Sequence, residues 1–166
     1  EMLESGFTRV GEFHYLHHDQ GGERFTNPAE MAVAIAAAAA DTGIGLTLLP
    51  VFYAHAGFGG APPTAGQARF INDLDSFARL LDESRAAVAP LPGAVVGLAP
   101  HSLRAVTPEE LAALVGLAGD LPMHIHIAEQ IKEIDDCLAW SGARPVEWLL
   151  ANAPVGANWC LVHATH

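Results

Sequence analysis

The sequence predicts an α/β fold with parallel strands, arranged as an incomplete (β/α)8 TIM-type barrel of about five consecutive βα units. Apolar stretches typical of buried strands alternate with segments whose apolar residues recur every three or four positions, as they do in helices. Polar residues follow nearly every expected strand at its carboxyl end, where barrel active sites lie. A whole barrel takes about 250 residues, so a chain of 166 residues predicts only part of one.

The expected strands combine large or β-branched apolar residues with turn signals at their ends. The segment Ile44–Phe52 is nearly continuously apolar, which is typical of a strand covered on both faces. The full set of expected strands is Thr8–Tyr15, Ile44–Phe52, Ala94–Pro100, the first part of Leu121–Gln130, and Asn158–His163.

The expected helices have start and stop signals. Asn27 and Pro28 supply a cap and a first-turn proline, with Gly43 as the stop. Thr107-Pro108 repeats this start, and Gly119 ends that helix. Further helices are indicated by apolar spacing at Leu74, Phe77, Leu80, Leu81 and Val88, by Ile131, Ile134 and Leu138, and by a start at Arg144-Pro145.

An open doubly wound sheet is the alternative architecture. It would normally carry a glycine-rich phosphate loop that leads into a helix, and Gly57–Gly60 imitates such a loop without a helix start. The barrel is therefore favoured. The chain lacks an initial Met, opens like the tail of a helix and stops abruptly at His166, so residues 1–166 are interpreted as one partial barrel domain from inside a longer protein.

Composition excludes several classes of partner. Eight Lys and Arg against 19 Asp and Glu give a net charge of -11 without a basic patch, which disfavours nucleic acid. The longest apolar run, within Met31–Ala40, is too short to span a bilayer, so no membrane partner is expected. Cys137 and Cys160 lack the spacing of a disulfide framework, which predicts reduced thiols and a cytoplasmic location.

The stretch Leu121–Gln130 (LPMHIHIAEQ) carries the clearest chemical signal. Along a strand His124 and His126 share one face, and Glu129 follows where the strand gives way to a loop. Two imidazoles and a carboxylate there suit a metal-activated water and a proton shuttle. The alternative is a strand with two hydrogen-bonded core histidines and a glutamate that caps a helix.

The segments HIHIAEQ and LVHATH resemble the metal-dependent amidohydrolase superfamily, in its aminohydrolase branch. Adding EFHYLHHD, LTLLPVFYAHAGFGG and GLAPHSLRAVTPEEL extends the resemblance along essentially the whole chain, to the formimidoylglutamate deiminases. The resemblance implies hydrolysis of N-formimidoyl-L-glutamate to N-formyl-L-glutamate and ammonia, a step of histidine degradation. It also implies one divalent metal ion, zinc or else iron, and a homodimer.

The same resemblance implies roles for individual residues. His126 would be a metal ligand, Glu129 the proton shuttle, and His163 a neighbour of the metal and the attacking water. A small substrate with carboxylates needs cationic partners, and a guanidinium can bind a carboxylate through two hydrogen bonds. The expected substrate contacts are Arg104, His101 and Tyr15.

Simpler roles remain open for these and other residues. Arg104 could instead pair with Glu109 or Glu110 on the surface, and Tyr15 could be ordinary packing at a strand end. Structural or loop roles are expected for the other histidines, the tryptophans and the cysteines: His17, His18, His55, His166, Trp140, Trp148, Trp159, Cys137 and Cys160.

The sequence also departs from the family pattern. Two metal-binding elements of the superfamily, a His-x-His on the first barrel strand and an Asp on the eighth, are missing, so the 166 residues alone are expected to be inactive. Two other functions therefore stay open. One is a sister aminohydrolase that acts on a purine or related ring, and the other is a non-catalytic barrel remnant. Arg104 favours the acidic, acyclic substrate.

Overall fold

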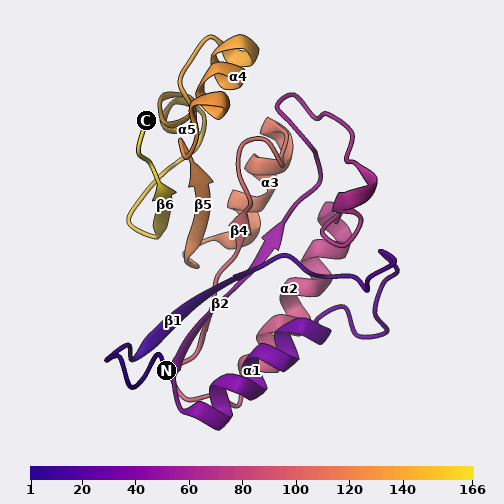
Figure 1. The fold of residues 1–166 in the computed structure, drawn as a ribbon, viewed down its shortest axis with the longest axis vertical. Coiled ribbons are helices and arrows are strands. Elements are labelled where there is room, and N and C mark those ends of the chain that lie inside the picture. Colours follow the sequence, from indigo (N-terminus) through magenta and orange to yellow (C-terminus); the bar gives the residue numbers. More distant parts are fainter.

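A computed structural model describes residues 1–166 and shows parallel strands alternating with helices (Figure 1). The strands are β1 (Arg9–His14), β2 (Gly45–Phe52), β3 (Val95–Val96), β4 (Ala99–Pro100), β5 (Met123–Ile127) and β6 (Trp159–His163). The helices are α1 (Glu30–Thr42), α2 (Leu74–Val88), α3 (Pro108–Ala118), α4 (Ile131–Ser141) and α5 (Pro145–Asn152), with a 3-10 turn at Ala65–Gln67.

The strands lie side by side in chain order. β2 pairs in parallel with β1 on one side and with β3 and β4 on the other, and β5 pairs in parallel with β6. Parallel bridges from Leu98 to Met123 and from Ser102 to His126 join the two groups. A doubly wound sheet reverses its strand order at one point, and no reversal occurs here. The observed order is that of consecutive βα units.

The third expected strand, Ala94–Pro100, is divided into β3 and β4 at Gly97. The Gly97 N–H donates to the Leu48 carbonyl of β2, whereas the next N–H, that of Leu98, donates to the Pro122 carbonyl on the other side. A side chain at Gly97 would collide with the Pro122 carbonyl oxygen. The predicted strand is therefore interrupted at Gly97, where only glycine fits, but β3 and β4 both pair with β2 in the same register, so its course along β2 is confirmed.

Helices α1 and α2 pack side by side along one face of β1 and β2 (Figure 1). The buried positions of α1 are all alanine, which allows this helix to approach the sheet closely, whereas α2 buries larger residues such as Phe77 and Leu80. Almost every residue of β2 is buried, as its apolar sequence predicts. None of the helices is both long enough and apolar enough to cross a membrane.

The ends of the helices confirm most of the predicted signals. Gly43 ends α1 in the left-handed conformation, and Thr107 caps α3 through its side chain. The start of α1 is corrected: the cap position is Ala29, and the Asn27 side chain instead accepts a hydrogen bond from the Ala29 N–H. Pro28 therefore precedes the helix and does not occupy its first turn.

The predicted buried face of α4 is partly wrong. Ile134 is buried, but Ile131 and Leu138 are exposed, and their places in the core are taken by Glu133 and Cys137. Two other packing expectations have mixed outcomes. The Trp140 ring packs against those of Phe58 and Trp148, as expected. Cys137 is buried as expected, whereas Cys160 lies exposed on β6, the outermost strand of residues 1–166, and its expected structural role stays a prediction.

Candidate active site

The carboxyl ends of the parallel strands bring three histidines into a row. The ring centroid of His101, just after β4, lies 5.2 Å from that of His126 on β5. The His126 ring in turn stacks at 5.4 Å on that of His163, the last residue of β6. On β5, His124 and His126 share the half-exposed face while the residues between them are buried, as the alternation predicts.

Glu129 follows β5 and faces His163. The Glu129 Oε1 lies 3.8 Å from the His163 Nε2, and both side chains are 38% exposed. The distance exceeds that of a direct hydrogen bond, so both atoms remain able to bind a third group. Sequence reasoning placed these two residues together correctly, from elements that are far apart along the chain.

The backbone around Glu129 and His163 adopts a conformation that residues with side chains seldom adopt. The non-glycine residues with positive φ are Ala128 (53°), His163 (73°) and Ala164 (47°), all at the ends of β5 and β6. Each such residue costs about 1 kcal/mol or more. The Thr165 N–H and hydroxyl both donate to the Ala128 carbonyl, at 3.2 and 3.0 Å, and hold the two strand ends together.

Burial favours the neutral form of two imidazoles in this row, those of His101 and His126. It lowers the pKa of His101 to about 3, with smaller contributions from the charges of His126 and Arg104. Burial also lowers the pKa of His126, and a proton on His163 would lower it further. A neutral imidazole is the form that binds a metal ion.

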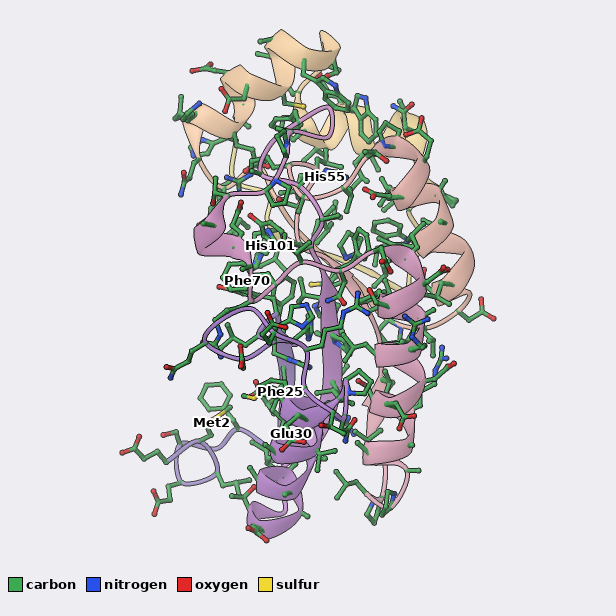
Figure 2. All side chains as sticks on the ribbon, turned by 90° about the vertical axis from the view of Figure 1, so that its right-hand side faces the viewer. Met2, Phe25, Glu30, His55, Phe70 and His101 are labelled. Carbon is green, nitrogen blue, oxygen red and sulfur yellow. The ribbon has the colours of Figure 1, made fainter.

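Aromatic rings enclose the middle of the row. Tyr15 lies 5.6 Å from His101 between ring centroids, so the structure brings these two predicted substrate contacts together. Phe70 lies close to His101 in Figure 2 and packs on Tyr15 at 4.8 Å. Sequence reasoning missed Phe13, whose ring is 4.3 Å from that of His126, and Tyr53, 4.7 Å from His101. The alternation of β1, which aligns Phe13 with Tyr15, could have identified the first of them.

Arg104 lies near His101 and His126, and its charge adds to the effect of burial in lowering the pKa of both imidazoles. It lines a cavity of about 550 Å³ together with Gln130 and Glu133, and its Nε is buried without a partner. The alternative ion pair with Glu109 or Glu110 is wrong. The Glu110 Oε2 instead accepts hydrogen bonds from the His55 Nε2 at 2.9 Å and from the Thr107 N–H at 2.8 Å.

The residues at the strand ends fit part of a metal site. His126 and His163 place two imidazoles on adjacent strands, and the Glu129 carboxylate lies beside His163. A catalytic zinc ion takes three protein ligands and one open position. No group of three His, Cys, Asp or Glu side chains in residues 1–166 is arranged to hold a metal ion. This chain therefore supplies some of the donors that such a site requires, and not all of them.

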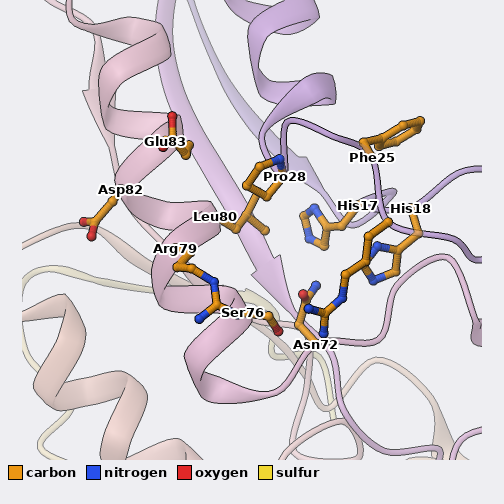
Figure 3. Close-up of a pocket in the computed structure, with 11 residues that line it drawn as sticks. His17, His18, Phe25, Pro28, Asn72, Ser76, Arg79, Leu80, Asp82 and Glu83 are labelled. Carbon is orange, nitrogen blue, oxygen red and sulfur yellow. The ribbon is translucent and has the colours of Figure 1, made fainter.

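A second group of histidines follows β1 and is built differently. The Nε2 of His17 donates to the Val51 carbonyl and that of His18 to the Ile71 carbonyl, both at 2.8 Å. Burial lowers the pKa of His14 to about 4 and that of His17 to about 3. Both His17 and His18 border a cavity of about 480 Å³ against α2 (Figure 3). That these two histidines support the site or its loops, and do not bind a metal, stays a prediction.

Comparison with known proteins assigns the family. The model of the Amidohydrolase family matches residues 1–166, which is the whole chain. The chain belongs to the amidohydrolase family. It is similar to the formimidoylglutamate deiminase of Pseudomonas aeruginosa, with 55% identity over 167 aligned positions that cover 100% of this chain and 37% of that protein.

Solved structures agree with this assignment. The crystal structure of an amidohydrolase from Brucella melitensis is 64% identical with a TM-score of 0.98, covering 99% of this chain and 37% of that one. An adenosine deaminase from Xanthomonas campestris, solved with bound zinc, is 25% identical with a TM-score of 0.67, over 96% of this chain and 31% of that one. This amidohydrolase chain thus has a TIM-barrel-type fold and spans about a third of its relatives' length.

Proposed function

We propose that the complete amidohydrolase hydrolyses N-formimidoyl-L-glutamate to N-formyl-L-glutamate and ammonia. The observation that carries the proposal is the convergence of Glu129, His126 and His163 at the ends of β5 and β6, in a chain 55% identical to a formimidoylglutamate deiminase. Residues 1–166 would contribute five consecutive βα units to one (β/α)8 barrel domain. Cys137 and Cys160 are both free, which supports a cytoplasmic setting with reduced thiols.

One divalent metal ion, zinc before iron, completes the proposed site. His126 would hold it, together with ligands that lie outside residues 1–166. When bound, the metal supplies a water molecule whose pKa is lowered toward 7. The zinc ion in the similar adenosine deaminase supports this choice of metal.

Glu129 would move the proton. Its carboxylate takes a proton as the water oxygen bonds to the formimidoyl carbon, and it then gives that proton to the terminal nitrogen, which becomes an amino group. The remaining hydroxyl proton of this adduct would pass through the same carboxylate to the amino group, so that the carbon–nitrogen bond breaks, the formyl C=O forms and ammonia leaves. His163, whose Nε2 is 3.8 Å from the Glu129 carboxylate, would orient the attacking oxygen. Both side chains are partly exposed, so a substrate can reach them.

Arg104, His101 and Tyr15 would bind the substrate. The buried and unpartnered Nε of Arg104 supports a role in binding a carboxylate, because a buried N–H donor without a partner is otherwise costly. Tyr15 and His101 lie together on the other side of His126, where the remainder of a small acyclic substrate would pack.

A purine-type deaminase is the second candidate, and one observation favours it. The rings of Phe13, Tyr15 and Tyr53 surround His101, and Phe70 packs on the two tyrosines. Such a cluster suits the stacking of a heterocycle. A 5-methylthioadenosine/S-adenosylhomocysteine deaminase from Shouchella clausii is 27% identical over 169 aligned positions, covering 100% of this chain and 33% of that protein.

Ammonia release by the protein from the complete reading frame, with zinc added, decides between these candidates. Release from N-formimidoyl-L-glutamate that falls 100-fold or more in Glu129→Gln is the expected result, since a general acid–base typically contributes a factor of about 10² to 10⁴. Release from guanine or 5-methylthioadenosine alone would replace the proposed substrate with a ring. The absence of ammonia release from every substrate would favour a non-catalytic barrel.

A further inference from the structure

Glu133 is a buried carboxylate next to the proposed proton shuttle. It is the third residue of α4, is only 2% exposed, and forms no ion pair. A buried charge of this kind needs hydrogen bonds to compensate for its lost hydration. Its hydrogen bonds therefore show what the residue does.

Both carboxylate oxygens of Glu133 bind the turn that follows β5. The Oε1 accepts a hydrogen bond from the Ala128 N–H at 3.0 Å, and the Oε2 accepts one from the Glu129 N–H at 3.1 Å. One side chain thus holds two consecutive peptide groups, including the peptide of Glu129 itself.

Two other helices show the ordinary use of a glutamate at this position. Glu110 of α3 and Glu147 of α5 are also third in their helices, and each accepts a hydrogen bond from the N–H of the cap residue, Thr107 or Arg144. Glu133 makes no such bond to its cap residue, Gln130, and reaches one and two residues further back. Capping of α4 therefore does not account for its position.

The turn held by Glu133 is fixed on both sides. Ala128 has a positive φ of 53°, its N–H is bound by Glu133, and its carbonyl is bound by Thr165. Thr165 lies two residues after His163. The peptide that carries Glu129 is thereby connected to both α4 and the end of β6.

We infer that Glu133 is a positioning residue, which holds the turn so that the Glu129 carboxylate faces His163. The inference rests on the proposed function in one respect, the proton transfer assigned to Glu129. The Glu133→Gln substitution keeps the shape of the side chain but places an NH₂ group against one of the two N–H donors. The turn would then lose one hydrogen bond and gain a repulsive contact.

The test uses steady-state kinetics of the complete zinc-loaded protein with N-formimidoyl-L-glutamate. Glu133→Gln is expected to lower kcat about 10- to 100-fold with KM within about twofold, because misplacement of a catalytic group by about 1 Å costs a factor of this size. In a Glu129→Gln background the same substitution should lower kcat no further. The matched control, Glu147→Gln, removes a glutamate from the third position of α5, where it bonds only the cap residue Arg144, and should leave kcat unchanged.

Several results would overturn the inference. An unchanged kcat in Glu133→Gln, or an equal additional loss in the Glu129→Gln background, would indicate a structural role only and leave the proposed function intact. Should Glu133→Gln fail to fold, Thr165→Val removes a side-chain hydrogen bond from the opposite side of the turn. It is expected to lower kcat about threefold, and no change would overturn the inference.

A crystal structure separates the failure of the inference from that of the proposed function. If the wild-type protein does not act on N-formimidoyl-L-glutamate, the proposed function fails, and the inference is judged from Glu133→Gln coordinates alone. A shift of the Glu129 carboxylate away from His163 by about 1 Å or more would support the positioning role. An unmoved carboxylate would overturn it.

Discussion

At the ends of β5 and β6, His126 and His163 stack at 5.4 Å beside an acidic side chain, whereas His17 and His18, which follow β1, are buried and donate to backbone carbonyls. Both pairs occupy the carboxyl ends of parallel strands, and the sequence marks both with closely spaced histidines. The first pair retains nitrogens that can bind another group, and the His163 side chain is 38% exposed. The second pair uses its Nε2 atoms to bond the protein's own backbone, and its Nδ1 atoms are buried.

The difference teaches that clustering of histidines at strand ends does not by itself identify a site. Desolvation acts on both groups, since burial is the main cause of the lowered pKa of His126 and of His17. The groups are distinguished by what faces them. His163 faces Glu129 across 3.8 Å, whereas the Nε2 of His17 is already bonded to Val51. The same substitution should therefore affect metal binding and activity in the group at β5 and β6, and should leave both unchanged in the group after β1.

The largest expected difference is in metal content. His126→Asn in the complete protein should reduce bound zinc to near zero and activity by more than 100-fold, because loss of a ligand exceeds the 10- to 100-fold effect of losing a group that supports one. The matched substitution His18→Asn should leave both unchanged. Metal analysis of purified protein with an ammonia assay provides the measurement, and retention of zinc by His126→Asn would contradict the assignment.

A substitution of Arg104 tests whether an acidic substrate binds beside the histidines of β5 and β6. Arg104→Gln should raise KM for N-formimidoyl-L-glutamate about 10- to 100-fold, since hydrogen bonds to charged groups contribute about 1.5 to 3 kcal/mol. Arg85→Gln, which removes an arginine paired with Asp82 on the surface of α2, is the control. Equal KM values for the wild type and Arg104→Gln would remove Arg104 from the substrate contacts.

Acid should destabilise the folded protein, because two buried histidines, His14 and His17, resist protonation in the folded state. Folding lowers the pKa of His14 from 6.5 to about 4 and that of His17 to about 3, so the unfolded chain binds more protons than the folded one below pH 6.5. Stability should therefore fall as the pH drops from about 6.5 to 4, by up to about 1.4 kcal/mol per pH unit for each histidine. Urea unfolding midpoints across this range provide the measurement, and constant midpoints would contradict it.

The smallest expected effect is that of His17→Phe, which should lower stability without changing activity. His17→Phe leaves the buried Val51 carbonyl without a donor, so the free energy of unfolding at pH 7.5 should fall by about 1 to 3 kcal/mol. The kcat should stay within twofold of wild type. The same variant should also show a shallower loss of stability in acid, because one titrating group has been removed. A large fall in kcat with intact folding would mean that the buried histidines belong to the site.

Much of the fold and the centre of the site could be predicted from the sequence because their signals are local. The apolar β2 segment, the cap at Thr107 and the shared face of His124 and His126 all follow from periodicity and turn chemistry. The division of the third strand at Gly97 could not be predicted, since it depends on the approach of the Pro122 carbonyl from another element.

Other features were missed because identical local patterns have different uses. Glu133, Glu110 and Glu147 are each the third residue of a helix, and only tertiary structure shows that Glu133 binds the turn before its helix. The aromatic cluster was missed for a related reason. Tyr53 and Phe70 follow different elements and meet only when β2 places Tyr53 beside His101.

Gly97 has a consequence for where inactivating mutations can occur. Because Gly97 has no side chain, the Pro122 carbonyl can approach it, and the Leu98 N–H donates to that carbonyl. Further along, the His101 carbonyl accepts a hydrogen bond from the His126 N–H of β5. A side chain at this position would push the Pro122 carbonyl away, and so separate β2–β4 from β5 and β6. We expect the His101 imidazole to separate from that of His126 in Gly97→Ala, so that the complete protein loses its proposed activity although every proposed catalytic side chain is still present.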